Sequence, residues 1–462
     1  MIEGLKPYAE YKESGQEWLG RVPTHWDVRR TKLILREIDS RSTTGKEQLL
    51  RVSQYTGVTP RKAADGSDAP DTRAASLVGY KRVSVNDLVI NIMLAWNGSM
   101  GVSRFDGIAS PAYCVYRLNK CAQPWYYHQL FRLPLYKGRI KAVSTGVIES
   151  RLRLYSDDLG RIEAILPPPD EQAAIVRFLD HANRKIDGWV RAKRKLIGLL
   201  NEQKQAIIHR AVTRGLHPDV PLKPSGIPWL GDIPKHWEVV RSRRLFNVRT
   251  ELARPDDVQL SATQSYGVIP QADYEARIGR RVVKISMHLE KRRHVEKDDF
   301  VISMRSFQGG IERAWASGAI RSSYVVMKPD PSVEVSFFSY VLKSPGYIRA
   351  LQATGDFIRD GQDLTYGNFR MVDLPLMPLP EQKEIAAYIE SATKALEASI
   401  ARTEREIALM QEYRTRLTAD LVTGKLDVRE AAAHLPAPPV ETAVEPTPDE
   451  PLEGIETEEI EA

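Results

Sequence analysis

The chain has almost no cysteine, which excludes the protein classes that depend on it. Cys114 and Cys121 are its two cysteines among 462 residues, too few for a disulfide framework or a cysteine-rich zinc site. No run of eighteen apolar residues occurs, so no membrane span is expected. Residues 1–7 do not form the apolar region of a secretory signal. We therefore expect a cytoplasmic protein that does not contact a membrane.

Motifs of catalytic sites are also missing. Thr44-Gly45-Lys46 and Thr423-Gly424-Lys425 lack the first glycine of a phosphate-binding loop. No Asn/Asp-Pro-Pro-aromatic, Gly-x-Ser-x-Gly or His-Glu-x-x-His sequence is present. Pro169-Asp170 and Glu202-x-Lys204 have the residue types of a metal-dependent nuclease, but one helix would hold them about 48 Å apart, too far to share a metal. We therefore predict that the chain is not an enzyme and holds no cofactor or metal.

Basic charge is abundant but unevenly distributed. Residues 436–462 hold nine acidic and no basic residues, together with six prolines. So little apolar surface is available for burial there that we expect a disordered tail. Without these residues, 66 basic side chains face 51 acidic ones, a net charge of +15. A surplus of this sign suits a nucleic-acid partner, although a basic soluble surface would show it too.

The strongest pattern is a duplication. Trp18-Leu19-Gly20-x-x-Pro23-x-His25-Trp26 recurs about 210 residues later as Trp229-Leu230-Gly231-x-x-Pro234-x-His236-Trp237. Pro169-Asp170-Glu171-Gln172 recurs as Pro380-Glu381-Gln382, each at the start of a long helical stretch. A period of this length predicts two copies of a domain followed by a helix. His25 and His236 have no companion ligands nearby in the sequence, so we expect packing or capping roles for them.

Between these motifs, each half has the pattern of a mixed domain of short strands and helices. Residues 85–90 correspond to 297–302, where a polar turn leads into a β-rich run. Tyr136 and Tyr347 lie in short helical patterns that lead to Thr-Gly turns at 145–146 and 354–355. The predicted fold class is therefore α/β (α+β).

A long helix closes each half. Asp170-Glu171-Gln172 supplies an N-cap and an acidic first turn to the first helix. Helices of about 44 residues, about 66 Å long, need partners. Net charges of +4 for 170–213 and −2 for 380–423 favour pairing with each other; packing on their own domains is the alternative. The 4-3 spacing of apolar residues predicts a coiled-coil seam, which Lys193 and Gln203 interrupt. The predicted seam residues are Ile175, Leu179, Ala182, Ile186, Trp189, Leu196, Leu200 and Ile207 in the first helix and Ile385, Ile389, Ala392, Leu396, Ile400, Ile407, Met410 and Leu417 in the second.

Together these features resemble the specificity (S) subunits of type I restriction–modification systems. The resemblance covers residues 8–430 and includes Gly57-Val58-x-Pro60 with Gly267-Val268-x-Pro270 beside the motifs above. It implies two target-recognition domains, each followed by a helix, with the helices paired antiparallel as a spacer and the molecule pseudo-twofold symmetric. Each domain would bind one half of a bipartite target in double-stranded DNA. The implied partners are two methyltransferase (M) subunits and, where the system has them, translocase–endonuclease (R) subunits, which would bring S-adenosylmethionine, ATP and Mg²⁺.

The predicted domains are 1–168 and 225–379 for the two target-recognition domains, 169–214 and 380–428 for the spacer helices, 215–224 for a linker and 429–462 for the tail. We expect the helices and the Trp-Leu-Gly segments to dock the M subunits. Deletion of 381–423 should then abolish assembly before it affects either domain's fold. The rival interpretation is a non-catalytic coiled-coil adaptor without sequence-specific DNA binding.

Candidate DNA contacts are Arg, Lys and Gln residues in loops and at strand ends, because these side chains can pair with base edges. Each of them could equally be a solvated surface residue. Tyr55, Tyr266 and Trp96 could contact thymine methyl groups, but core packing is favoured for them. The candidates are Arg51, Gln54, Arg61, Lys62, Arg73, Lys81 and Arg82 in the first domain, Gln264, Gln271, Arg277, Arg280, Arg281, Arg305 and Gln308 in the second, and Arg151, Arg153, Arg359 and Gln362 after the Thr-Gly turns, where they could bind phosphates.

Overall fold

The chain forms two compact units in a computed structural model. The structure describes residues 5–61, 74, 76–148, 151–282, 291–355 and 364–436. Unit 1 comprises residues 1–191 and 407–462, and unit 2 comprises residues 192–406. Each unit therefore contains one end of each long helix. Four predicted DNA contacts lie outside the described residues: Lys62, Arg73, Arg359 and Gln362.

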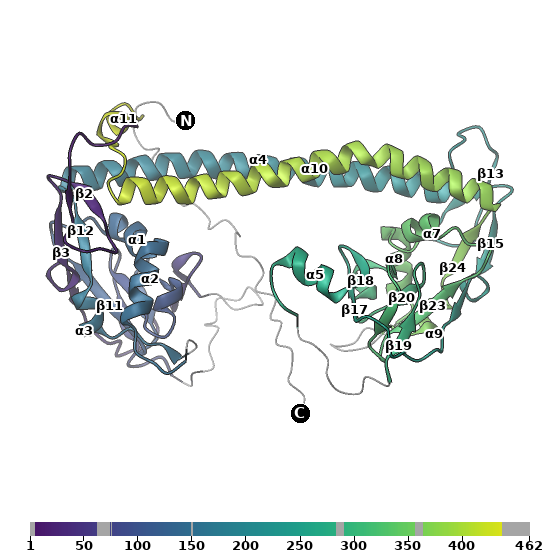
Figure 1. The fold of residues 1–462 in the computed structure, drawn as a ribbon, viewed down its shortest axis with the longest axis horizontal. Coiled ribbons are helices and arrows are strands. Elements are labelled where there is room, and N and C mark those ends of the chain that lie inside the picture. The colour runs from purple at the N-terminus through teal and green to yellow at the C-terminus, as the bar shows by residue number, and fades with distance from the viewer. Residues whose placement is uncertain are drawn as a thin grey trace. The chain divides into compact units, whose positions relative to one another are not determined.

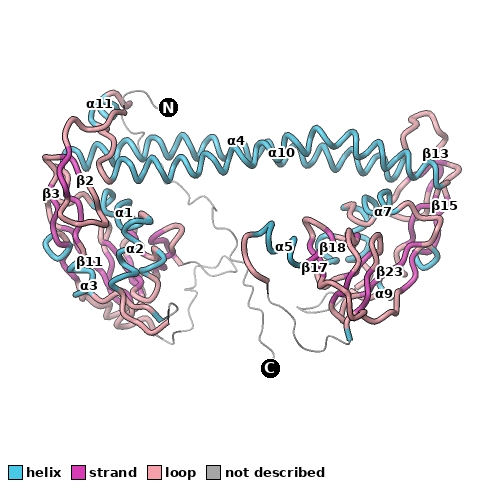
Figure 2. Tube along the Cα trace, in the orientation of Figure 1, coloured by secondary structure: helices cyan, strands magenta, loops and turns pink. Residues whose placement is uncertain are grey.

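Unit 1 contains a four-stranded antiparallel sheet, whose longest strand, β11, is labelled in Figures 1 and 2. Its order is β4 (Leu35–Glu37), β11 (Tyr113–Leu118), β8 (Leu88–Asn91), β9 (Met100–Val102). Antiparallel pairs surround it: β1 (Tyr11–Glu13) with β2 (Arg21–Pro23), β3 (Asp27–Arg30) with β12 (Glu163–Leu166), β5 (Leu50–Ser53) with β6 (Gly57–Pro60), and β7 (Lys81–Val83) with β10 (Gly107–Ala109). Its shorter helices are η1 (Thr31–Leu33), η2 (Ala95–Asn97), α1 (Pro124–Arg132), α2 (Pro134–Val143) and α3 (Ser156–Arg161).

Unit 2 repeats this arrangement strand by strand. Its four-stranded sheet has the order β16 (Phe246–Val248), β23 (Val325–Pro329), β20 (Phe300–Ile302), β21 (Glu312–Arg313). The pairs are β13 (Leu222–Pro224) with β14 (Asp232–Pro234), β15 (Glu238–Arg241) with β24 (Asp373–Leu376), β17 (Leu260–Thr263) with β18 (Gly267–Pro270), and β19 (Arg293–Val295) with β22 (Gly318–Ile320). The shorter helices are η4 (Ser242–Arg244), α5 (Gln271–Ile278), α6 (Ser306–Gly309), α7 (Val335–Val341), α8 (Pro345–Gln352) and α9 (Tyr366–Phe369).

The mixed fold predicted from the sequence is of the α+β kind, because the strands named here pair antiparallel. The linker predicted at 215–224 contains strand β13, which pairs with β14. Helix α5 has no counterpart among the described residues of unit 1. Within the described part of the chain, no helix is both long and apolar enough to cross a membrane.

The long helices α4 (Pro169–Arg214) and α10 (Leu379–Val422) run antiparallel. In unit 2, the Nζ of Lys193 lies 2.7 Å from Glu406 and the Nζ of Lys204 lies 2.7 Å from Glu397. The residue number of the glutamate in α10 falls as that of the lysine in α4 rises, so the two helices run antiparallel in this unit. In unit 1, Arg414 of α10 pairs with Asp187 of α4. Figure 1 shows the two helices side by side.

Three details of the helices differ from the predictions. Helix α4 includes Pro169, so Asp170 lies in the acidic first turn and is not the N-cap. Leu196 is 41% exposed and therefore does not lie in the buried seam, whereas Thr393 and Thr403 of α10 are buried and donate their hydroxyls to backbone carbonyls one turn earlier. Helix α10 ends at Val422, before the predicted end at 428.

The C-terminal part of the described chain completes the core of unit 1. Leu421, Val422 and Val428 are fully buried in the same apolar cluster as Trp26. Helix α11 (Arg429–Ala433) follows, and Ala432 is also buried there. The prediction of a disordered tail from 429 is therefore wrong for residues 429–436, which are held by apolar burial; residues 437–462 lie outside the described chain. In unit 2, Ile208, Ala211 and Val212 of α4 take the corresponding place.

Candidate nucleic-acid interface

The two repeated motifs meet in each unit through a glutamate. In unit 1, Glu171 is buried and accepts hydrogen bonds from the Trp26 Nε1 (2.8 Å) and the Tyr8 hydroxyl (2.9 Å). Its carboxylate also lies 2.6 Å from the His25 Nε2. In unit 2, Glu381 contacts the Trp237 Nε1 at 2.9 Å and the His236 Nε2 at 2.8 Å. His25 and His236 are 41% and 46% exposed and each contacts the glutamate of the following long helix, a contact that the expectation of packing or capping did not include.

The neighbouring glutamine fixes each helix start to the domain before it. The Gln172 side chain donates to the carbonyls of Pro167 and Cys121, and accepts from the Gln123 N–H at the start of α1. Gln382 makes the equivalent three bonds, to Met377, Ser332 and Glu334. Both glutamine side chains are fully buried. The Glu-Gln pair therefore fastens the start of each long helix to the domain that precedes it in the chain.

A short hairpin in each unit carries several of the predicted DNA contacts. Gly57 and Gly267 follow the turns with φ of +74° and +72°, a left-handed conformation that a side chain at these positions would strain. Tyr55 and Tyr266 in the turns are 50% and 38% exposed, so the expectation of core packing is wrong for both. Trp96 is half-buried, and the Nζ of Lys141 lies 5.5 Å from its ring centroid.

Arg132, at the end of α1, binds the hairpin of unit 1 and the loop next to it. Its guanidinium donates to the carbonyls of Gln54 and Tyr55 (both 2.8 Å), and more weakly to Ser53 (3.3 Å). It also donates to Met100 (2.6 Å) and Gly98 (3.3 Å) on β9 and the turn before it. Burial lowers the pKa of Arg132 to about 10, so the group stays charged at neutral pH. Arg132 thus joins two loops that lie far apart in the sequence.

Lys343 takes this place in unit 2. Its Nζ donates to the Gln264 carbonyl (2.8 Å) and to both carboxylate oxygens of Glu312, the nearer at 2.7 Å. Burial raises the pKa of Glu312 to about 7, against the opposing effect of Lys343. A single ammonium and a buried carboxylate therefore replace the guanidinium of unit 1.

Substituting Arg132 by Ala should loosen the unit 1 hairpin. The carbonyls of Ser53, Gln54 and Tyr55 would lose a charged donor, and a hydrogen bond of this kind contributes about 1.5–3 kcal/mol. We expect faster hydrogen exchange in residues 50–60 and little change in the protection of β8 or β11. R132K should recover only part of the protection, because one ammonium cannot bind both loops in fork geometry. Unchanged exchange in the hairpin of R132A would contradict this role.

The predicted residues of unit 1 fall into two groups. Arg51, Arg61, Arg82, Arg151 and Arg153 are exposed and Gln54 is half-buried, so all six are placed where a ligand could reach them. Lys81 is only 7% exposed and lies 3.7 Å from Glu37 and 3.8 Å from Asp39. The ammonium is thus buried beside two carboxylates of its own unit, whose side chains are 37% and 58% exposed, and the prediction of Lys81 as a DNA contact is wrong.

In unit 2 the structure brings several predicted residues together. The Gln264 side chain donates to the Arg305 carbonyl at 2.8 Å, which joins the hairpin turn to α6. The Arg277 guanidinium of α5 lies 4.8 Å from the ring centroid of Tyr266 in the same turn. Gln271 is 5% exposed and donates its amide to Glu275 and Val282, so it is structural and not a DNA contact. The remaining members are exposed: Arg280, Arg281 and Gln308.

Arg132 and Lys343 are absent from the predicted set. Both were recognisable from the duplication, since each is a basic residue four positions before the paired tyrosines Tyr136 and Tyr347 and two before a proline. A basic side chain at the end of an apolar helix is also common for electrostatic reasons alone. The sequence therefore did not separate a helix-end charge from a residue that binds two loops.

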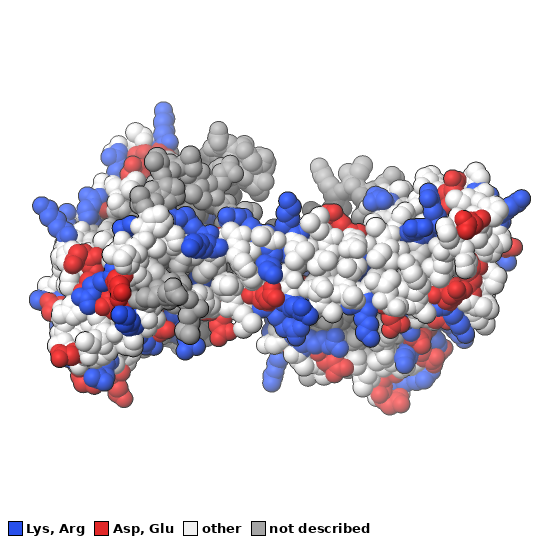
Figure 3. All heavy atoms as spheres, turned by 90° about the horizontal axis from the view of Figure 1, so that it is seen from above, with Lys and Arg blue, Asp and Glu red and all other residues white. Residues whose placement is uncertain are grey.

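Charge is mixed on the face drawn in Figure 3. Lys and Arg side chains lie there among Asp and Glu side chains, in places directly beside them, with uncharged side chains over the rest of the face. Among the described residues of the long helices, several apolar side chains are exposed: Leu196 (41%), Leu199 (53%) and Tyr388 (47%) in unit 2, and Leu409 (64%) and Tyr413 (36%) in unit 1. These exposed side chains are apolar positions of the described helix surface that another protein could cover.

Comparison with known proteins identifies relatives over almost the whole chain. A Methanocaldococcus jannaschii protein assigned as the type I restriction enzyme MjaX specificity subunit is 22% identical over 442 residues, covering 91% of this chain and 98% of the relative. The type I restriction enzyme MjaVIII specificity subunit of the same organism is 23% identical over 254 residues, covering 52% of this chain and 54% of that protein. A solved chain described under complex assembly and conformational transition of the type I R-M system has a TM-score of 0.59 at 15% identity, covering 87% of this chain and 98% of its own length. No family model matches.

Proposed function

We propose that this chain, which belongs with the specificity subunits of type I restriction–modification systems, selects the DNA sequence on which such a complex acts. The observation that carries the proposal is the strand-by-strand duplication of a domain with exposed Arg and Gln residues around a hairpin turn. Two similar domains on one chain suit a bipartite target in double-stranded DNA, with one domain for each half-site. The paired helices α4 and α10 set the length of the gap between the half-sites.

The chain binds DNA but does not catalyse a reaction. Two methyltransferase subunits dock on the exposed apolar side chains of the long helices, and translocase–endonuclease subunits join where the system has them. S-adenosylmethionine, ATP and Mg²⁺ belong to those partners. The complex works in the cytoplasm, where its DNA target is.

Exposed apolar side chains on the helices would also suit a coiled-coil adaptor without sequence-specific DNA binding. The two interpretations differ in their dependence on salt. Contacts with phosphates release counterions, so the DNA affinity of a specificity subunit falls steeply as salt rises. An adaptor with incidental basic domains would show neither specific binding nor that slope.

The test is methylation mapping at base resolution after co-expression of the chain with its candidate methyltransferase subunit. We expect a two-part methylated sequence with a constant gap. Charge removal at exposed candidates should alter one half-site at a time, with Arg51→Ala and Arg61→Ala affecting one half and Arg277→Ala and Arg305→Ala the other. Lys81→Met is the matched control for lost charge without a lost DNA contact. Methylation that is independent of this chain would refute the proposal.

A further inference from the structure

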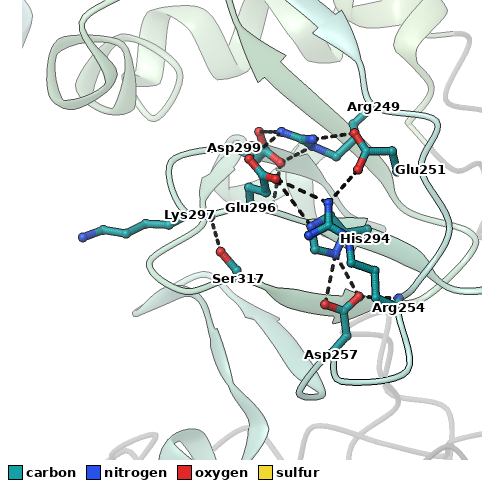
Figure 4. A network of polar contacts seen from close by, with 9 residues as sticks. All are labelled: Arg249, Glu251, Arg254, Asp257, His294, Glu296, Lys297, Asp299 and Ser317. Carbon is teal, nitrogen blue, oxygen red and sulfur yellow. Dashed lines mark hydrogen bonds and ion pairs between the residues drawn. The ribbon is translucent and has the colours of Figure 1, made fainter.

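A polar network in unit 2 contains none of the residues proposed to contact DNA (Figure 4). The segment after β16 supplies Glu251, Arg254 and Asp257, and β19 with the turn after it supplies His294 and Glu296. One oxygen or nitrogen atom from each of Glu251, His294 and Glu296 lies within 4.8 Å of the others. Histidine and glutamate are both among the usual protein ligands of zinc.

His294 is held in the orientation of a metal ligand. The residue is 1% exposed, and its Nδ1 lies 2.8 Å from Asp257 Oδ2. A carboxylate on one ring nitrogen fixes the tautomer and leaves the other nitrogen to bind a metal. That Nε2 is buried without a hydrogen-bond partner among the described residues. Its distance of 3.7 Å from Glu296 Oε1 is too long for a hydrogen bond but suits two atoms that each lie about 2.0–2.2 Å from one metal ion.

Two arginines contact the glutamates, and the side chain of one of them, Arg254, occupies the place where a metal would bind. Arg249 approaches one oxygen of each carboxylate, Glu251 Oε1 at 2.8 Å and Glu296 Oε2 at 3.4 Å. The other oxygens, Glu251 Oε2 and Glu296 Oε1, lie 3.0 and 3.6 Å from the guanidinium of Arg254. Arg254 is half exposed, so its side chain can leave for solvent without uncovering the core. Arg249 is buried and its guanidinium is further bound by Asp299, so it stays.

The charge of the network favours a divalent cation. Figure 4 draws four carboxylates, Glu251, Asp257, Glu296 and Asp299, against the two guanidinium groups, and Lys297 points away from them. Asp257 and Asp299 are buried, with side chains 8% and 2% exposed, whereas Glu251 and Glu296 are 50% and 48% exposed. A cation could therefore reach the two glutamates from solvent, next to buried negative charge. A divalent ion in place of Arg254 would add one further positive charge and bind the orphaned nitrogen.

The first domain provides an internal comparison. The backbone N–H of Arg82 donates to the Ser40 carbonyl, as that of His294 donates to the Glu251 carbonyl. The backbone N–H groups of Ser84 and Glu296 likewise donate to the carboxylates of Asp87 and Asp299. Positions 251, 294 and 296 therefore correspond to Ser40, Arg82 and Ser84. Two serines and an arginine offer neither an imidazole nor a carboxylate to a zinc ion. The set of one histidine and two glutamates is therefore found in the second domain and not at the matching positions of the first.

We propose that Glu251, His294 and Glu296 bind one divalent transition-metal ion, with Zn²⁺ the preferred occupant, and that the ion displaces the side chain of Arg254. One imidazole and two carboxylates leave a fourth position for water, and Asp257 orients the imidazole. Mg²⁺ and Ca²⁺ bind more weakly because they prefer oxygen ligands alone. The ion fastens the segment that follows β16 to β19.

The experiment is calorimetric titration of ZnCl₂ into the full-length chain, stripped of metal with EDTA and carrying no histidine tag. We expect one equivalent to bind. H294A should abolish that binding, and D257N should weaken it about 10–100-fold. R254A should bind Zn²⁺ more tightly than the natural chain, because the competing guanidinium is gone. H217A, which removes an exposed histidine elsewhere in unit 2, should leave the affinity unchanged.

The opposite signs of H294A and R254A separate the site from general loss of folding. E251Q/E296Q keeps the shape of both side chains and should also abolish binding while hydrogen exchange in β20 and β23 stays unchanged. Equal weakening by R254A and H294A would overturn the proposal, as would Zn²⁺ binding that survives H294A. Absence of stoichiometric binding to the natural chain would overturn it as well.

Discussion

Substituting Glu171 by Ala is expected to destabilise unit 1 by about 3–5 kcal/mol, the usual cost of removing one partner from a buried charged network. The Glu171 side chain is 4% exposed. Its loss would leave the buried Trp26 Nε1 and the Tyr8 hydroxyl without an acceptor and would remove the partner of His25. Burial and the Glu171 carboxylate both raise the pKa of Tyr8, so this hydroxyl stays a donor in the folded chain.

The same change in unit 2 should have a smaller effect. The Glu381 side chain is 22% exposed and holds Trp237 and His236. We therefore expect E381A to cost about 1–3 kcal/mol, the price of leaving a donor unsatisfied. D170A, an exposed first-turn carboxylate beside Glu171, is the matched control and should cost less than about 1 kcal/mol.

Hydrogen exchange with mass spectrometry measures both effects separately, because each variant should lower protection only in its own unit. E171A should affect peptides from β3, β12 and residues 417–433, and E381A those from β15 and β24. Equal effects of E171A and D170A would show that Glu171 acts only on the helix dipole. Protection lost in both units at once would show that the two networks do not act locally.

The duplication made much of the fold predictable. Two copies of the same motifs in the same order predict two copies of one strand arrangement, and the sheets β4-β11-β8-β9 and β16-β23-β20-β21 follow that expectation. The long helices follow from the heptad spacing of apolar residues and, for α4, from the absence of proline between Pro169 and its end, although Gly188 and Gly198 lie inside that helix. The pseudo-twofold relation of the two domains stays a prediction.

The role of Glu171 was not predictable from its surroundings in the sequence. An acidic residue in the first turn of a helix is explained by the helix dipole alone. Its burial depends on Trp26, which lies 145 positions away in the sequence. Local sequence patterns give no information on contacts between residues this far apart in the chain. The recurrence of the Trp motif and the Glu-Gln motif together in both halves was nevertheless consistent with a contact between them.

The packing of the second helix on unit 1 was also hidden. Leu417 fitted the predicted seam of a coiled coil, and the same apolar side chain fills the core of unit 1 together with Leu421 and Val422. Deletion of 381–423 would therefore remove three core side chains of unit 1 and Glu381 of unit 2. This loss argues against the expectation that the deletion abolishes assembly before it affects either domain's fold.

Lys81 and Arg82 show why exposure could not be assigned residue by residue. They are adjacent on β7, so their side chains point to opposite faces of the strand. Lys81 is buried and lies near Glu37 and Asp39, while the Arg82 side chain is 49% exposed and pairs with Glu47 at 3.3 Å. The register of a three-residue strand decides which is accessible, and a short strand carries too little alternation to fix that register in advance.

Lengthening both long helices should change the gap between the two recognised half-sites. Four residues inserted after Gly198 of α4, with four inserted after Arg402 in the facing stretch of α10, keep the ion pairs of Lys193 and Lys204 on the matching sides. Four helical residues add about 6 Å and turn about 40° beyond a full turn. One base pair rises about 3.4 Å and turns about 36°. Under the proposed function, we expect the methylated sequence to gain one or two base pairs in its gap and to keep both half-sites.

The control and the contrary result follow from the same physical argument. Four residues inserted after Gly226, an exposed glycine with open space around it, lengthen a loop of unit 2 and should leave the gap unchanged. A single insertion in α4 alone would shift its seam against α10 and should reduce methylation at every sequence. An active double-insertion variant that still methylates the original sequence would show that the helices do not determine the gap. Small shifts inside a domain could not absorb the added length of about 6 Å.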